Sequence, residues 1–240
     1  MELFLITFLT FVAAIVGTVT GFGISTVMLP VLALFLPLPQ ALLLVGIIHW
    51  FGSVWKVVFF REGIDWRLIW LFGLPGVLFS YLGARLVFEI SSSTLSFTLG
   101  LFLMVYALFL FTHTHFKLST KNLLTAIIGG GLSGFFAGIF GVGGAIRAAF
   151  LSAFDLKKTV FLATAGVIGF VVDSTRLFAY MQDGVRLDPF FLWGLLVFIP
   201  TSFLGAYVAK RIVDHIPQNA FRVTVAVFLL LIGFRFAFFA

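Results

Sequence analysis

The chain has 240 residues, of which 62% are hydrophobic and only 10% are charged, and its mean hydropathy is +1.20. Soluble domains carry about 25% charged residues, so a soluble fold could not bury this much apolar surface. The net charge of +6 would suggest a nucleic-acid partner for a soluble protein, but here the basic residues stand mainly at the ends of apolar segments. We therefore expect a lipid bilayer, and no nucleic acid, around the protein. The absence of cysteine excludes disulfides and thiolate metal sites.

Apolar segments follow one another along the whole chain. A helix needs about 20 mostly apolar residues to cross a bilayer, so there is room for about eight spans and no separate soluble domain. Ordinary spans are predicted at residues 40–60, 66–88, 95–112, 159–181, 189–209 and 220–239. Residues 3–36 and 122–154 are too long for one simple span, and glycines interrupt both. The pattern predicts an all-α polytopic membrane protein, integral and multi-pass.

The two halves of the chain match each other. A shift of 120 residues places Gly21-Phe22-Gly23 on Gly141-Val142-Gly143, Gly46 on Gly166, and Lys56 on Arg176. Internal duplication of this kind is the usual build of secondary transporters. We predict two homologous transmembrane repeats, residues 1–116 and 117–240, each with one glycine-broken helix, re-entrant or discontinuous, and three spans.

The relative orientation of the repeats depends on the broken segments. If each crosses the membrane once, the repeats are parallel and the basic residues divide almost evenly between the two sides. If each turns back, the repeats are inverted, and one side receives nine basic residues: Arg61, Arg67, Lys117, Lys121, Lys157, Lys158, Lys210, Arg211 and Arg222. The other side then receives Arg85, Arg186 and Arg235. Because Lys and Arg accumulate on the cytoplasmic side, this split favours inverted repeats with both termini outside.

The glycine breaks are the first candidates for substrate binding. Glycine weakens a helix, and a broken helix offers free N–H groups and a positive dipole end, which suit an anion. The candidate residues are Gly21, Phe22, Gly23, Gly141, Val142, Gly143 and Gly144. We expect the two breaks to meet near the membrane midplane. The alternative is close helix packing through small residues, which we expect for Gly130, Gly134 and Gly138.

Charged residues inside the predicted spans are the second group of candidates. A central charge costs at least about 2.5–3.5 kcal/mol, so such residues usually face a polar cavity. Lys56, Arg147 and Arg176 are candidates for binding the substrate, and His49 and Asp173 are candidates for proton coupling. The alternatives are that Lys56 reaches the membrane interface, that Asp173 and Arg176 form a structural pair, and that His49 is a packing residue.

No arrangement in the sequence points to catalysis. There is no zinc-protease helix motif, no Ser-centred set and no carboxylate pair placed for acid–base chemistry. We predict no enzyme activity, no cofactor and no metal site.

The residues resemble those of the TauE/SafE family, the sulfite exporter or four-toluene-sulfonate-uptake-permease group. The resemblance is carried by Thr20-Gly21-Phe22-Gly23 through Pro30, and by Phe140-Gly141-Val142-Gly143-Gly144 in the second half. Gly63-Ile64-Asp65-Trp66 and Leu82-Gly83-Ala84-Arg85 also fit. Two departures concern the second half: Ala145 follows Gly144 where many relatives have a third glycine, and Phe150 stands at the expected proline.

The resemblance implies a secondary transporter, more specifically an exporter of a small sulfur-containing anion such as sulfite or an organosulfonate like sulfoacetate, coupled to the proton-motive force. The expected location is the plasma membrane of a bacterium or archaeon, where the expected partners are the small anion and the lipid bilayer, and a homodimer is left open. The alternatives are an anion channel of the same fold and a non-transporting membrane structural protein.

Overall fold

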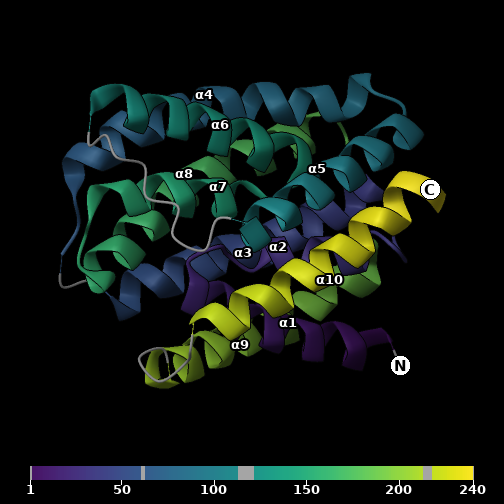
Figure 1. The fold of residues 1–240 in the computed structure, drawn as a ribbon. Coiled ribbons are helices and arrows are strands. Elements are labelled where there is room, and N and C mark those ends of the chain that lie inside the picture. The colour runs from purple at the N-terminus through teal and green to yellow at the C-terminus, as the bar shows by residue number, and fades with distance from the viewer. Residues whose placement is uncertain (1, 61–62, 113–121, 213–217, 240) are drawn as a thin grey trace.

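The computed structural model describes residues 2–60, 63–112, 122–212 and 218–239. In these ranges the chain forms ten α-helices and one short 3-10 helix, and no strand (Figure 1). The first half holds α1 (Glu2–Thr20), α2 (Ser25–Leu32), α3 (Leu38–Phe59), α4 (Trp66–Glu89) and α5 (Ser92–Thr112). The second half holds α6 (Leu123–Phe140), α7 (Gly143–Leu151), η1 (Ser152–Phe154), α8 (Lys158–Gln182), α9 (Pro189–Ile212) and α10 (Gln218–Phe239).

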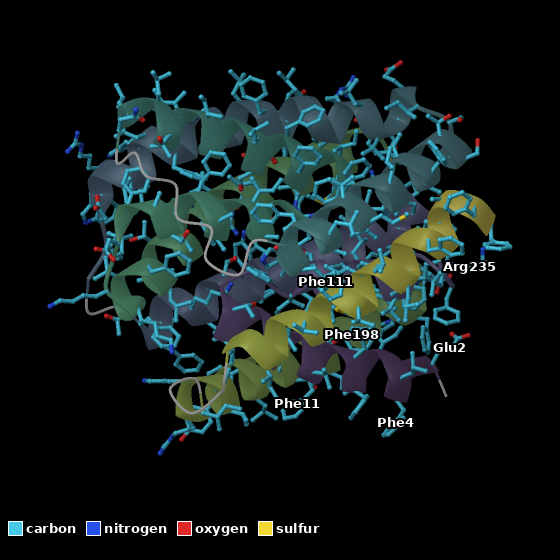
Figure 2. All side chains as sticks on the ribbon, in the orientation of Figure 1. Glu2, Phe4, Phe11, Phe111, Phe198 and Arg235 are labelled. Carbon is cyan, nitrogen blue, oxygen red and sulfur yellow. The ribbon has the colours of Figure 1, made fainter. Side chains whose placement is uncertain are left out.

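The helices are those of a multi-pass membrane protein. In the described ranges, seven of them are long and apolar enough to cross a bilayer: α1, α3, α4, α5, α6, α8 and α9. Large apolar side chains point outward from the bundle, and Phe4 of α1, which is 77% exposed, is one of them (Figure 2). A surface of this kind fits lipid and not water. The predicted all-α polytopic membrane fold is therefore confirmed.

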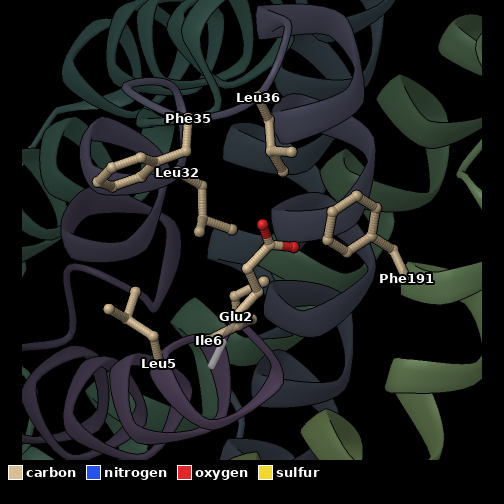
Figure 3. Close-up of a pocket in the computed structure, with 7 residues that line it drawn as sticks. All are labelled: Glu2, Leu5, Ile6, Leu32, Phe35, Leu36 and Phe191. Carbon is tan, nitrogen blue, oxygen red and sulfur yellow. The ribbon is translucent and has the colours of Figure 1, made fainter.

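The first glycine break reverses the chain. The backbone N–H of Gly23 donates to the carbonyl of Gly17 at 3.2 Å, and the hydroxyl of Thr10 lies 3.8 Å from the sulfur of Met28. Farther from the break, the residues after α2 line a pocket together with Glu2 and the start of α1 (Figure 3). Since later residues pair with progressively earlier ones, α1 and α2 form a hairpin whose tip is the break.

The second glycine break forms the same kind of hairpin. Gly141 ends α6 in the left-handed conformation, with φ of +68°, and the hydroxyl of Ser133 donates to the carbonyl of Gly143 at 2.9 Å. Farther back, a Cβ on Gly129 would lie 2.6 Å from the Phe150 side chain. Phe150, which stands at the expected proline, therefore packs α7 against α6. Both broken segments turn back, as the inverted arrangement requires.

Corresponding helices of the two halves run in opposite directions. Between α3 and α8, Gly46 faces Leu177 and Ser53 faces Gly169, so the two helices are antiparallel. Between α5 and α10, Gly100 faces Ala237 and Gly233 faces Met104. These directions support inverted repeats. The duplication itself stays a prediction, and its boundary between residues 116 and 117 lies outside the described residues.

Figure 1 shows both termini at the same end of the bundle, while α9 ends at the other end, where Lys210 lies over Phe59 at the end of α3. Basic residues near that second end include Arg67, Lys157, Lys158, Lys210 and Arg211. Arg61, Lys117 and Lys121 lie outside the described residues. The arrangement supports the predicted orientation, in which the termini are outside the cell.

The small residues of α6 allow a close approach to α4. A Cβ on Gly130, Gly134 or Gly138 would overlap the backbone of α4, at Phe72, Gly76 and Ser80 respectively. Since no side chain separates the two helices there, the expectation that these three glycines serve helix packing is confirmed. This contact fixes the hairpin of the second half against the first half of the chain.

Replacing Gly134 with Ala should destabilise the protein, because the new methyl group would meet the carbonyl of Gly76. Overpacking of this kind costs about 1–3 kcal/mol. The control is Gly131→Ala in the same helix, whose Cβ would lie 3.4 Å from Phe79, an ordinary contact. Thermal unfolding in detergent should show a lower melting temperature for Gly134→Ala alone. Equal melting temperatures for the two variants would contradict the close α4–α6 contact.

Two single-cysteine variants of this cysteine-free chain test the orientation. Lys157 and Ser92 are both exposed at helix ends, and they lie on opposite sides of the predicted topology. In intact cells, a membrane-impermeant maleimide should label Ser92→Cys and spare Lys157→Cys until the cells are lysed. The reverse pattern would place the termini inside the cell.

Candidate functional site

The tips of the two hairpins meet inside the protein. A Cβ on Gly144 would overlap the carbonyl oxygen of Phe22, and a Cβ on Gly23 would overlap the ring of His49. His49 lies near the middle of α3, so the first tip lies about halfway along a spanning helix. The expectation that the two glycine breaks come together is confirmed by these contacts, and their position at the membrane midplane stays a prediction.

The break residues contribute mainly their backbone. Gly21, Gly23 and Gly141 have φ values of +75°, +89° and +68°, a region that residues with a Cβ rarely adopt. The ring of Phe22 turns away toward Tyr106, 6.2 Å between centroids. Val142 is buried in the apolar core. Among the candidates at the breaks, Gly23, Gly141, Gly144 and the carbonyl of Phe22 therefore face the region where the tips meet. Gly21 faces Phe161 of α8 and Gly143 packs against α6, while the side chains of Phe22 and Val142 serve packing.

The short helices that follow the breaks begin without side-chain caps. Ile24 precedes α2 and Val142 precedes α7, and neither side chain can accept a hydrogen bond from the first turn. The first N–H groups of a helix have no partner within the helix, and together with the dipole they favour an anion. Both hairpins thus bring a helix N-terminus to the region where the breaks meet.

Charged side chains surround this region. Among the described residues, the buried charged groups are three cations and one carboxylate: Lys56 at 1% exposure, Arg147 at 1%, Arg176 at 0% and Asp173 at 2%. Lys56 is enclosed by protein, so the alternative in which it reaches the membrane interface is wrong. Gly144 and Gly169 both face Arg147 Nη2, at 3.6 and 2.9 Å from an added Cβ, which places this guanidinium beside the second break.

Asp173 connects Arg176 and His49. Arg176 Nε donates to Asp173 Oδ1 at 2.7 Å, and Asp173 Oδ2 lies 3.6 Å from His49 Nδ1. The same imidazole nitrogen is 2.7 Å from the hydroxyl of Ser25 at the start of α2. The candidates His49, Asp173 and Arg176 therefore form one connected group. The ion pair between Asp173 and Arg176, which the sequence offered as an alternative, is part of this group.

Several polar atoms of the cluster have no hydrogen-bond partner among the described residues. These buried atoms are His49 Nε2, Ser53 Oγ, Arg147 Nε, Asp173 Oδ2, and both terminal nitrogens of Arg176. With His49 neutral, the three cations and one carboxylate leave two positive charges without a counter-ion. Because a buried charge is costly unless it is paired, the arrangement is suited to binding an anion.

Two serines of the cluster were missed by the sequence analysis. Ser25 binds His49, and Ser53 lies beside Arg147 opposite Gly169. Only Ser53 had a usable signal: the shift of 120 residues that matches Lys56 with Arg176 also matches Ser53 with Asp173. No group of three or more metal-ligating side chains occurs in the ranges the structure describes.

Comparisons with known proteins agree with this anatomy. The family model described as sulfite exporter TauE/SafE matches residues 6–236. The chain is also 25% identical to a probable membrane transporter protein of Methanocaldococcus jannaschii, over 84% of this chain and 84% of the relative. The family match includes both hairpins and every residue of the charged cluster.

Replacing Asp173 with Asn should destabilise the protein strongly, because it leaves Arg176 buried and unpaired. Breaking a buried ion pair costs about 3–5 kcal/mol. The control is Asp183→Asn, which breaks a pair with Arg85 at 2.5 Å where Arg85 is 46% exposed. Exposed pairs contribute about 0–1 kcal/mol. Unfolding of both variants in anion-free buffer measures the difference, and similar losses would contradict the described burial of the cluster.

Proposed function

The chain belongs to the sulfite exporter TauE/SafE family of membrane transporters, and from this premise we propose that it is a secondary transporter that exports a small sulfur-containing anion. Sulfite and organosulfonates such as sulfoacetate are the proposed substrates. The observation that carries the proposal is the excess of buried positive charge beside two uncapped helix ends.

The site supplies both parts of anion recognition. The guanidinium groups of Arg147 and Arg176 and the ammonium group of Lys56 supply charge and donors that match sulfur oxyanions. The N–H groups at the starts of α2 and α7 supply further donors without adding a full charge. A dianion would balance both excess charges, whereas a monoanionic sulfonate would balance one.

Energy for export is available from two sources. A potential that is negative inside drives an anion outward by about 2.3 kcal/mol per charge per 100 mV. Proton coupling would add to this, and His49 and Asp173 are placed for it: they lie 3.6 Å apart, and Asp173 also binds Arg176. A proton gained or lost by this pair would change the charge beside the anion.

Alternating access would require one hairpin and its neighbours to move relative to the other. At one end of the bundle, Arg85 of α4 binds Asp183 after α8. At the other end, the ammonium of Lys210 on α9 lies 5.5 Å from the ring centroid of Phe59 on α3. These two contacts join corresponding helix ends, and we infer that each closes the path to the site from its own side.

Two other functions fit the same anatomy. An anion channel would conduct without saturation and without proton dependence. A non-transporting structural protein would use the glycines for packing alone, so substitutions of Arg147 or Arg176 would change stability and leave anion binding absent. We favour the transporter because of the family and the unneutralised cluster.

Purified protein in liposomes tests the proposal. Radiolabelled sulfite should cross with a saturable rate that increases when a potassium diffusion potential drives the anion. Arg147→Gln should reduce the rate at least tenfold, because it removes one of the unpaired charges, while Lys157→Gln, an exposed cation before α8, should retain the wild-type rate. Flux that never saturates would favour the channel. Wild-type liposomes that pass no sulfite, thiosulfate or sulfonate would overturn the proposed substrate class.

A further inference from the structure

The central helices α3 and α8 carry polar residues at two matching positions, and glycine at neighbouring ones. The 120-residue shift aligns Gly46, His49, Ser53 and Lys56 with Gly166, Gly169, Asp173 and Arg176. In each helix a cation follows a polar residue by three positions, which places both on one face. The chemical difference is that α8 has a carboxylate where α3 has a hydroxyl.

On α8 the cation has its own counter-ion. Arg176 Nε binds Asp173 at 2.7 Å, and both side chains are buried. An anion that approached Arg176 would therefore also approach the carboxylate of Asp173, which repels it. Although the terminal nitrogens of Arg176 lack partners, the charge on this side of the cluster is already balanced.

On α3 the cation has no counter-ion within its own helix face. Ser53 cannot neutralise Lys56, and Arg147 of α7 brings a second positive charge to the same side. Ser53 is 0% exposed, and its hydroxyl has no hydrogen-bond partner among the described residues. A buried hydroxyl without a partner costs free energy, and this one lies where two unneutralised cations gather.

The two glycines of α8 that face α3 allow the two helices to approach closely at this place. A Cβ on Gly169 would lie 2.8 Å from Ser53 Oγ and 2.9 Å from Arg147 Nη2, so both polar atoms flank the same point. One turn away, a Cβ on Gly166 would lie 3.2 Å from Lys56 Cβ. The donor hydroxyl, the guanidinium and the stem of Lys56 thus line one side of α8 where it has no side chain.

We propose that the transported anion binds on the Ser53 side of the cluster, between Ser53, Arg147 and Lys56. This inference rests on the proposed function and deepens it. Ser53 Oγ donates a hydrogen bond to an oxygen of the anion, and the two cations balance two negative charges. The site therefore prefers a compact sulfur oxyanion with two charges over a monoanionic sulfonate, and Asp173 with Arg176 forms the neighbouring, self-neutralised half.

Isothermal titration of thiosulfate into the detergent-purified full chain tests the assignment, with isethionate as the monoanionic comparison. Wild-type protein should bind thiosulfate at least tenfold more tightly than isethionate. Ser53→Ala removes one donor and should weaken thiosulfate binding about tenfold. Ser53→Asp introduces the carboxylate that α8 carries at the matching position, and it should weaken binding more than a hundredfold.

Two further variants separate binding from folding. Ser202→Ala removes an equally buried hydroxyl on α9, bound to Ile199 and Trp55, and should keep wild-type affinity. Gly169→Ala should also lose thiosulfate binding, because its methyl group would lie 2.8 Å from Ser53 Oγ and 2.9 Å from Arg147 Nη2 and would displace both groups. Affinities are compared only among variants whose melting temperature and elution volume on size exclusion equal those of the wild-type protein.

The outcomes distinguish this inference from the proposed function. Wild-type affinity in both Ser53→Ala and Gly169→Ala, with loss of binding in Arg176→Gln, would overturn the inference and place the anion at Arg176. Wild-type protein that binds neither thiosulfate, sulfite nor isethionate would overturn the proposed function itself, and the site assignment with it.

Discussion

Non-helical backbone inside a membrane has to be enclosed by protein, because lipid offers no hydrogen bonds. The two glycine breaks are such backbone, and much of the bundle is arranged to enclose them. The long helices α3 and α8 cross beside the hairpin tips, and α4 approaches α6 through glycines. The starts of α2 and α7, which have no side-chain cap, are thus kept from lipid and held at the centre of the molecule.

The same enclosure explains why charged side chains are found at the centre. Helix N-termini favour negative charge, and the nearby full charges are mostly positive, which supports the proposal that a mobile anion binds here. Asp173 is the exception, and it holds Arg176 and contacts His49. Burying positive charges without enough negative ones raises the free energy of the empty protein. A bound anion would lower that free energy again.

Much of this was predictable from the sequence. The span positions follow from hydropathy, and the match of Lys56 with Arg176 follows from the shift of 120 residues. The distribution of basic residues favoured broken segments that turn back, although a glycine break by itself permits a continuation as readily. The contacts of Thr10 with Met28 and of Ser133 with Gly143 show the reversal. Side-chain directions were not predictable: Phe22 turns toward Tyr106, and Ser53 was overlooked because a serine in an apolar helix is usually bonded to its own backbone.

The unequal pair of Ser53 and Asp173 has a consequence for the resting protein. In a transporter built from two identical inverted halves, exchanging the conformations of the halves turns the inward-open form into the outward-open form, and the two have equal free energy. Here the two ends carry different contacts, an ion pair at Arg85 and a cation–ring contact at Phe59, and the centre differs at Ser53. The inward-open and outward-open forms of the proposed transporter therefore differ in free energy. The empty protein populates one of them more than the other, so it waits for substrate with a preferred side open.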